Sequence, residues 1–387
     1  MKKLFGVLIF AAIAAFSAFA EIAFGGWVRT LPTFVGSDGE DIKTSATAVS
    51  WGEHFWSRFD ATWISDDGKA GLSMRLNADA NGVNTHDDVG IWLKPFDMLK
   101  IQIGWHENFG ELRGDLCYGS WDWLRPSTIV IEDEGITFSS APNKQGLGLE
   151  ITPTESLKIV ILTPLENALQ RGDYGFGETC VEAAYTFGEI ATVKAGFFGE
   201  YTKDNVEGDS KKYGRIEGAF DLIGIEKLFV TAGAAFRLAS SDYWKGNALT
   251  GANKINELYM LKAALGASYG ITDALKLTAS FAALLFNKDV ANDPAMVFGV
   301  GANYALSDEL GLVADIRMLM PNNDKDSTLS FMMGLDAAVN SNASLGLGFQ
   351  GVVGLGEKAT PGTLQIVEAV GNDKFVWAVP IKAELTF

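Results

Sequence analysis

The sequence predicts an all-β protein, a transmembrane antiparallel up-and-down β-barrel of about 18 strands, with about 16 as the alternative count. Three observations lead to this prediction. Apolar and polar residues alternate with a period of two in most of the expected strands. The connections between these strands alternate between short and long. No apolar run after the first 20 residues approaches the roughly 18 residues of a membrane-spanning helix, although the mean hydropathy is positive, at +0.12.

The composition suits the wall of a barrel better than a series of soluble domains. The 387 residues include 43 Gly and 25 Phe but only 10 Pro, and no run of biased composition separates one part of the chain from another. The formal net charge is −17, and removal of Lys2 and Lys3 would make it −19. Such a chain lacks the basic face that binds nucleic acid. A membrane protein without spanning helices must be a closed barrel, because hydrocarbon cannot satisfy backbone N–H and C=O groups.

The first 20 residues have the pattern of a secretory signal peptide. Lys2 and Lys3 form a basic start, residues 4–15 are apolar, and residues 18–20 form an A-x-A cleavage site. Cleavage is expected after residue 20, which would leave 21–387 as the barrel. The alternative is an uncleaved N-terminal helix.

Alternation of apolar and polar residues defines the strands in chain order. The first strand is expected at 22–31, and clear alternation follows at 99–106, 275–283, 345–350 and 374–387. In 275–283, for example, Leu, Leu, Ala, Phe and Ala alternate with Lys, Thr, Ser and Ala, as in a strand with one apolar face. The strands are expected to start near residues 22, 55, 69, 87, 98, 144, 156, 176, 190, 212, 226, 257, 274, 295, 309, 327, 343 and 373.

The connections between the expected strands alternate in length. Every second one is a turn of about two to five residues, whereas the others have about six to thirty-five, the asymmetry of membrane barrels. The short turns include 95–97, 153–155, 271–273, 307–309 and 340–342. Since such barrels have short turns on the periplasmic side, both termini are also expected there.

The two faces of the expected wall differ in polarity. Because about eight strands already suffice for a packed interior, a ring of about 18 should enclose a water-filled lumen, with its apolar face toward lipid. A charge facing lipid costs about 2–4 kcal/mol for Arg or Lys, so the charged face should point inward. The candidate pore-lining residues are Arg58, Asp60, Arg75, Lys100, Glu150, Lys194, Arg215, Glu217, Arg237, Lys262, Lys276, Asp315, Arg317 and Lys382. The same face also carries Arg29, Lys94, Lys158, Asp79, Glu182, Asp221, Asp336 and Glu384.

A second interpretation of these charges is that most are only solvated and paired with neighbours. Asp315 with Arg317, and Arg215 with Glu217, are candidates for such pairs because residues two apart share one face of a strand.

Residues 374–387 resemble the closing strand of bacterial outer-membrane β-barrels. Phe375, Trp377, Val379 and Phe387 lie on one apolar face, and the chain stops on that aromatic residue. The resemblance implies a porin-like barrel in the bacterial outer membrane, with outer-membrane lipid and small hydrophilic solutes or ions as partners. It also implies recognition of the strand ending in Phe387 by the barrel-assembly machinery, and it leaves a homotrimer open. The style of turns and strands is similar to that of spirochaete outer-membrane proteins.

The longest connection, 107–143, lies between the fifth and sixth expected strands and would be the third external loop. In general porins the third external loop folds into the lumen, and the resemblance implies the same here. The candidate constriction residues are Glu111, Arg113, Asp115, Glu132, Asp133 and Glu134. The alternative is a loop that packs outward on the surface. The two cysteines are too few for a disulfide scaffold, but a bond between Cys117 and Cys180 that tethers this loop is left open.

Signals of enzyme or metal chemistry are weak in this sequence. The glycine pattern at 346–351 fits a dinucleotide motif, but it lies inside an alternating strand with no helix after it. His54, His86 and His106 lack metal-ligand spacing. No cofactor, metal or catalytic residue is therefore expected. The predicted function is passive diffusion of small hydrophilic solutes. The alternatives are a substrate-selective transporter and a surface adhesin or antigen on a closed barrel.

Overall fold

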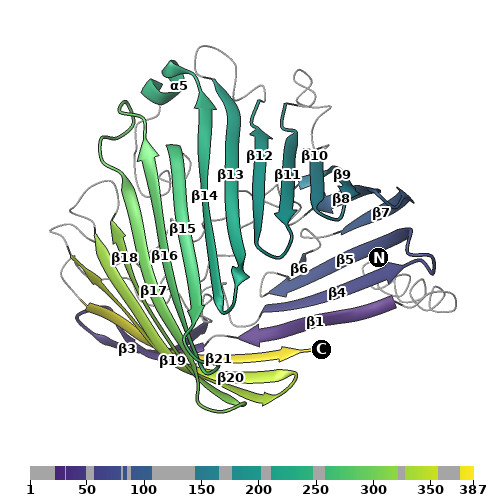
Figure 1. The fold of residues 1–387 in the computed structure, drawn as a ribbon. Coiled ribbons are helices and arrows are strands. Elements are labelled where there is room, and N and C mark those ends of the chain that lie inside the picture. Colours follow the sequence, from purple (N-terminus) through teal and green to yellow (C-terminus); the bar gives the residue numbers. More distant parts are fainter. Residues whose placement is uncertain are drawn as a thin grey trace.

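Antiparallel strands make up nearly all of the regular structure (Figure 1). The computed structural model describes residues 22–30, 32–48, 56–79, 82–84, 89–106, 144–164, 177–201, 211–246, 258–320, 327–355 and 375–387. Within these residues, no helix is long and apolar enough to cross a membrane.

The structure contains 21 strands and one helix in its described part. The strands are β1 (Ile22–Thr30), β2 (Pro32–Ser37), β3 (Ile42–Ala48), β4 (Trp56–Ile64), β5 (Ala70–Asp79), β6 (Gly82–Asn84), β7 (Val89–Phe96), β8 (Leu99–His106), β9 (Lys144–Thr154), β10 (Leu157–Pro164), β11 (Cys180–Phe187), β12 (Ala191–Gly199), β13 (Lys212–Ile225), β14 (Leu228–Ala239), β15 (Tyr259–Gly270), β16 (Leu275–Phe286), β17 (Ala295–Ala305), β18 (Leu310–Met320), β19 (Thr328–Asn340), β20 (Ala343–Gly354) and β21 (Phe375–Thr386). The helix is α5 (Ser241–Gly246), which follows β14.

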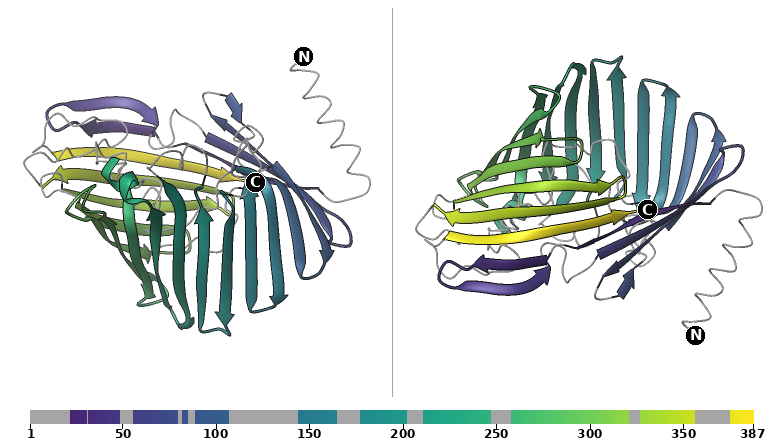
Figure 2. Two further views of the ribbon diagram at one scale, coloured as in Figure 1. Left: turned by 90° about the horizontal axis from the view of Figure 1, so that it is seen from above. Right: turned by 90° about the horizontal axis from the view of Figure 1, so that it is seen from below.

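Eighteen of the strands close into an antiparallel ring, which confirms the predicted fold class and the higher of the two expected strand counts. β1 pairs with β21 on one side and with β4 on the other, and from β7 to β21 each strand pairs with the next along the chain. The other three strands are additions to this ring. β2 runs beside β21 and pairs with β3 to form a hairpin (Figure 2), and β6 pairs with the end of β5. Only a connection between strands was expected where this hairpin lies.

The strand starts expected from alternation agree closely with the structure. The largest difference is at β11, which starts at Cys180 rather than near residue 176. Agreement of this kind follows from the period of two, because each strand needs one continuous apolar face.

β18 illustrates how the two faces of the wall differ. Leu312 and Ile316 are 41% and 50% exposed, whereas Asp315 and Arg317 between and beside them are buried. A side chain can be buried in a single-layer closed sheet only on its inner face. The exposed apolar residues therefore lie on the outside of the barrel, and the charged residues of β18 lie on the inside.

The short turns all lie at one end of the barrel, as their alternation with long connections predicted. They are built from local hydrogen bonds: the Oγ of Ser307 accepts from the backbone N–H groups of Glu309 and Leu310, and Thr272 does the same for Leu275. Such side-chain bonds to the following backbone stabilise tight turns.

Two neighbouring turns are joined by an exposed ion pair, in which Nζ of Lys227 lies 2.6 Å from Oδ1 of Asp273. This hydrogen bond lowers the pKa of Asp273, and the attraction of the two charges lowers it further. Because the folded-state pKa is depressed, the pair contributes stability above the unfolded pKa. That contribution is lost as the pH falls through the folded-state pKa.

Replacing Lys227 by Met should return the pKa of Asp273 to its ordinary value, because the donor and its charge are both removed. Titration of the Asp273 carboxyl by NMR in detergent micelles measures this shift. Asp67 is the matched control: its pKa is lowered chiefly by a hydrogen bond from Ser65, so it should not change. An unchanged Asp273 would show that the pair does not persist in solution.

Candidate functional site: the inner wall of the barrel

The candidate pore-lining residues all project from the inner face of the wall. In β14 and β15, for example, Arg237 and Lys262 are buried, whereas Phe236 and Leu265 on the opposite face are exposed. Their exposure varies along the barrel: Arg237, Lys262 and Arg317 are buried, whereas Lys276 near the short turns is exposed. The period of two thus groups these side chains on one surface, although they come from strands that are far apart in the sequence.

Most of the inner-face charges are ion-paired, either within one strand or across strands. The two pairs expected from sequence, Arg215 with Glu217 and Arg317 with Asp315, are both present. The others are Arg75–Asp60 (2.8 Å), Lys194–Asp221 (2.7 Å), Lys158–Glu150 (3.3 Å), Lys382–Asp336 (3.4 Å) and Arg29–Glu384 (3.8 Å). The pairing interpretation of these charges is therefore confirmed for these residues.

A larger ionic cluster lies near the long-connection end of β12–β14. Oε1 of Glu200 is 3.1 Å from Arg215, 3.3 Å from Lys212 and 3.7 Å from Arg237. Arg215 also bonds Glu217, which is fully buried, so one cluster holds three cations and two carboxylates. Glu200 was not among the predicted site residues, because it follows the end of β12 and its neighbours do not alternate.

The inner wall is not polar throughout, although the polar faces of the expected strands predicted a water-filled lumen. Between β10 and β18, toward the long connections, buried apolar side chains line it: Val160, Leu162, Cys180, Phe198, Ala219, Ala235, Tyr259, Ala264, Ala282, Leu284, Ala295, Val297 and Leu319. We call this set the apolar belt. In segments such as 159–162 and 281–285 both faces of the strand are apolar, so polarity alone could not separate the inner face from the outer face.

Two tryptophans also lie among the inner-face cations. Trp92 of β7 has the ammonium groups of Lys94 and Lys100 at 5.5 and 5.3 Å from its ring centroid. It lies against Gly71 of β5, where a Cβ atom would come within 2.3 Å of the ring. Trp27 of β1 is similarly covered by Arg29 at 3.8 Å. Neither tryptophan was among the predicted site residues, although Trp92 shares the face of Lys94.

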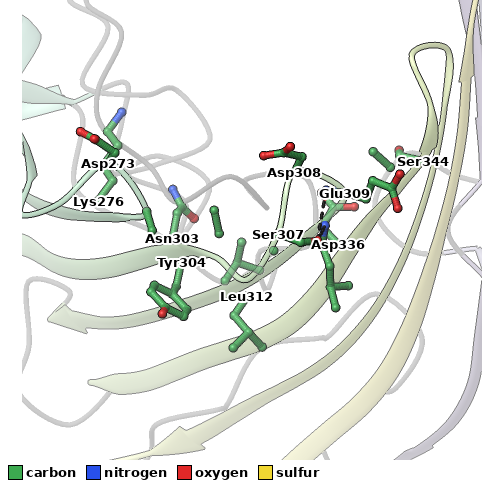
Figure 3. Close-up of a pocket in the computed structure, with 16 residues that line it drawn as sticks. Asp273, Lys276, Asn303, Tyr304, Ser307, Asp308, Glu309, Leu312, Asp336 and Ser344 are labelled. Atoms are coloured by element: carbon green, nitrogen blue, oxygen red, sulfur yellow. Dashed lines mark hydrogen bonds between the residues drawn. The ribbon is translucent and has the colours of Figure 1, made fainter.

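A cavity of about 470 Å³ opens at the short-turn end, beneath β16–β20 (Figure 3). Lys276, Asn303 and Asp336 contribute to it from neighbouring strands, and Asp308 and Glu309 contribute from a turn. Acidic groups predominate among its charged residues, so this mouth of the barrel should attract cations.

Several predicted features lie outside the described residues. These are the signal peptide, Cys117 and the candidate constriction residues Glu111, Arg113, Asp115, Glu132, Asp133 and Glu134. Cys180 is a buried free thiol, and its Sγ lies 3.7 Å from the carbonyl oxygen of Glu178.

Comparison with solved structures reveals a similar architecture in bacterial porins. A porin refined at 1.8 Å resolution is 16% identical, with 95% of this chain and 100% of that chain covered and a TM-score of 0.48. A triple mutant of the Rhodopseudomonas blastica porin is 12% identical with the same coverage and a TM-score of 0.50. No protein-family model matches the chain, and comparison with curated proteins found no match. At such identities the likeness shows the fold alone: this chain has a porin-type β-barrel fold.

Proposed function

We propose that the protein is a bacterial outer-membrane porin that lets small hydrophilic solutes diffuse through its barrel. The observation that carries this proposal is the contrast between the two faces of one closed wall. Charged residues from β1 to β21 are gathered on the inner face, and apolar residues such as Phe298 and Leu347 are exposed on the outer face. An exposed apolar band with a charged interior is what a lipid-embedded channel requires.

In this proposal the signal peptide exports the chain, and the strand ending in Phe387 is recognised during assembly. The third external loop, 107–143, enters the lumen, where its carboxylates narrow the passage opposite inner-wall arginines. The acidic cavity at the short-turn mouth then gathers cations at one entrance, over about the Debye length of roughly 8–10 Å at physiological salt.

A solute-selective channel is the second candidate, and the apolar belt favours it. Ala235, Ala282 and Leu284 have no exposed surface, so these side chains of the inner wall are not in contact with water. A narrow passage with a partly apolar lining selects among solutes by more than size.

Conductance of the refolded protein in planar lipid bilayers tests the proposed function. We expect an ohmic current with a weak preference for cations that fades as salt rises, because screening shortens the reach of charges. Replacing Arg58 and Arg75 together by Gln should shift the reversal potential in a salt gradient toward cations. Lys227→Gln, at an exposed turn, is the control and should leave it unchanged. A barrel that folds and inserts but passes no current would support the adhesin alternative instead.

A further inference from the structure

The cavity at the short-turn end is an accessible space that small residues of the inner wall leave open. Its volume is about 470 Å³, and its lining comes from β16 to β20 and from the turn between β17 and β18. In the register, Gly311 of β18 lies between Ala305 of β17 and Asp336 of β19. Within the described residues, a Cβ atom on Gly311 would come no closer than 3.8 Å to any atom beyond its chain neighbours. The cavity therefore has room for a small ligand.

The turn between β17 and β18 holds two carboxylates at the rim of this cavity. The N–H groups of Leu306 and Ser307 donate to the carbonyl oxygen of Leu310. The Oγ of Ser307 accepts from the N–H groups of Glu309 and Leu310. These local bonds fix the backbone of the turn, and the side chains of Asp308 and Glu309 remain exposed.

Two of the four carboxylates that line the cavity are already neutralised by lysines. Asp273 lies 2.6 Å from Nζ of Lys227, and Asp336 lies 3.4 Å from Nζ of Lys382. An ion pair attracts a further charge much less than a single carboxylate does, because its two charges nearly cancel. These two carboxylates therefore do not decide which ligand the cavity takes.

Three other charged side chains of the cavity have no ion-pair partner within the described residues. They are Lys276, which projects from the inner face of β16, and Asp308 and Glu309 of the turn. All three are exposed, so a solute can reach them. The cavity thus offers one ammonium group and two carboxylates to a ligand.

These opposite charges are separated by a gap that a small molecule can span. Lys276 is opposite Asn303 in the register, and β17 ends two residues later at Ala305. With about 4.8 Å between strands and about 3.4 Å per residue, the backbone at Lys276 is about 10–13 Å from that at Asp308. Figure 3 shows Asp308 between Lys276 and Ser344 along the cavity. A ligand with opposite charges a few bonds apart can therefore contact Lys276 and the turn together.

We propose that this cavity binds a basic α-amino acid. The α-carboxylate accepts hydrogen bonds from Nζ of Lys276, the cationic groups donate to Asp308 and Glu309, and the aliphatic stem lies over Gly311. The ligand has one more positive than negative charge and the three side chains have the reverse, so the two are complementary. This inference rests on the proposed function, because a solute that crosses the lumen passes this mouth, and it names the class of solute.

Equilibrium binding to the refolded full-length protein in detergent, by isothermal titration calorimetry, tests the site. The probes are L-lysine, L-norleucine, which lacks the side-chain ammonium group, and 1,5-diaminopentane, which lacks the carboxylate. We expect both analogues to bind about three- to tenfold more weakly than lysine, since each leaves a charged group of the cavity without its partner. No binding of lysine, or equal binding of the three probes, would overturn the proposal.

Variants with a matched control assign the roles of the charged residues. Lys276→Gln should weaken lysine about three- to tenfold and leave 1,5-diaminopentane no weaker. Asp308→Asn combined with Glu309→Gln should weaken both of these probes by at least as much. The control, Glu155→Gln combined with Glu189→Gln, removes two exposed carboxylates from other short turns and should leave lysine binding unchanged. Equal losses in the two double variants would show that only the general acidity of this mouth attracts the ligand, and would overturn the site.

Filling the cavity tests where the ligand lies. Gly311→Leu should fold, because its Cβ atom meets no close neighbour, and it should weaken all three probes about tenfold or more by occupying the space of the ligand. The shift in gel migration between unheated and heated samples confirms that the variant is folded. Undiminished lysine binding by the folded variant would place the ligand elsewhere and overturn the proposal.

Bilayer conductance of the same preparation distinguishes failure of the site from failure of the proposed function. An ohmic current without lysine binding would overturn the site and leave the porin proposal standing. Lysine binding without current would overturn passive diffusion and leave the binding site standing.

Discussion

Replacing Gly26 by alanine should prevent most of the protein from closing its barrel. Gly26 lies in the seam between the first and last strands, where its N–H donates to Phe387 O at 2.9 Å and its carbonyl accepts from Phe387 N at 3.0 Å. Its φ is +155°, and a Cβ atom would lie 2.1 Å from the backbone oxygen of Arg58. The strained conformation and the overlap each cost about 1–3 kcal/mol. The overlapping atom belongs to the backbone, so no rotamer change can relieve the contact.

The fraction of folded barrel after refolding into detergent or lipid measures this effect, by the shift in gel migration between unheated and heated samples. Gly25→Ala is the matched control, because its Cβ would meet only the carbonyl oxygen of Phe387, at 3.5 Å. We expect that control to fold as the unsubstituted protein does. Equal folding of the Gly26 and Gly25 variants would mean that the seam does not depend on this close approach.

Replacing Asp221 by asparagine should destabilise the barrel by about 3–5 kcal/mol, the usual cost of removing one partner from a buried ion pair. Asp221 binds Nζ of Lys194 at 2.7 Å and accepts a hydrogen bond from Thr231 at 2.6 Å. The side chains of Lys194 and Asp221 are each only 12% exposed. Within the described residues Asp221 is the ion-pair partner of Lys194, so the substitution leaves a buried ammonium group uncompensated.

Urea unfolding in lipid vesicles measures this loss. Asp60→Asn is the comparison, because the Arg75–Asp60 pair is more exposed, at 18% and 37%, and should lose less than about 1 kcal/mol. Adding Lys194→Met to Asp221→Asn removes the buried charge and should recover most of the lost stability. If the Asp221 and Asp60 variants lost equal stability, water in the lumen would be solvating Lys194.

Local chemistry explains why so much of the wall could be predicted. β16 alternates because each peptide unit turns successive side chains to opposite faces, so the sequence alone places Lys276 and Leu277 on different sides. The turn at 307–309 is equally local, since the hydroxyl of Ser307 bonds backbone groups two and three residues later. The eighteen strands and the short turns between them could therefore be recognised one at a time.

The apolar belt and the Glu200 cluster could not be recognised in this way. Ala235 and Ala282 fit either face of a strand equally well, so their burial on the inner wall depends on what surrounds them in space. Glu200 lies beyond the end of its strand, and its contacts with Lys212, Arg215 and Arg237 come from two further strands. The β2–β3 hairpin was missed for a related reason, since its pairing with β21 joins segments more than 300 residues apart.

The sequence by itself determined the strand order, the end at which each connection lies and the face from which each charged wall residue projects, because these follow from a two-residue repeat and from hydrogen bonds within single turns. Only the tertiary structure decided which inner-face charges form ion pairs and which buried polar atoms lack a hydrogen-bond partner. It also decided which part of the inner wall is buried from water. Those outcomes depend on the register between strands and on closure of the ring at Gly26 and Phe387. The register determines which side chains of the two adjacent strands lie next to a given side chain. Closure of the ring joins the first strand to the last. Neither the register nor the closure can therefore be predicted from any one segment of the chain.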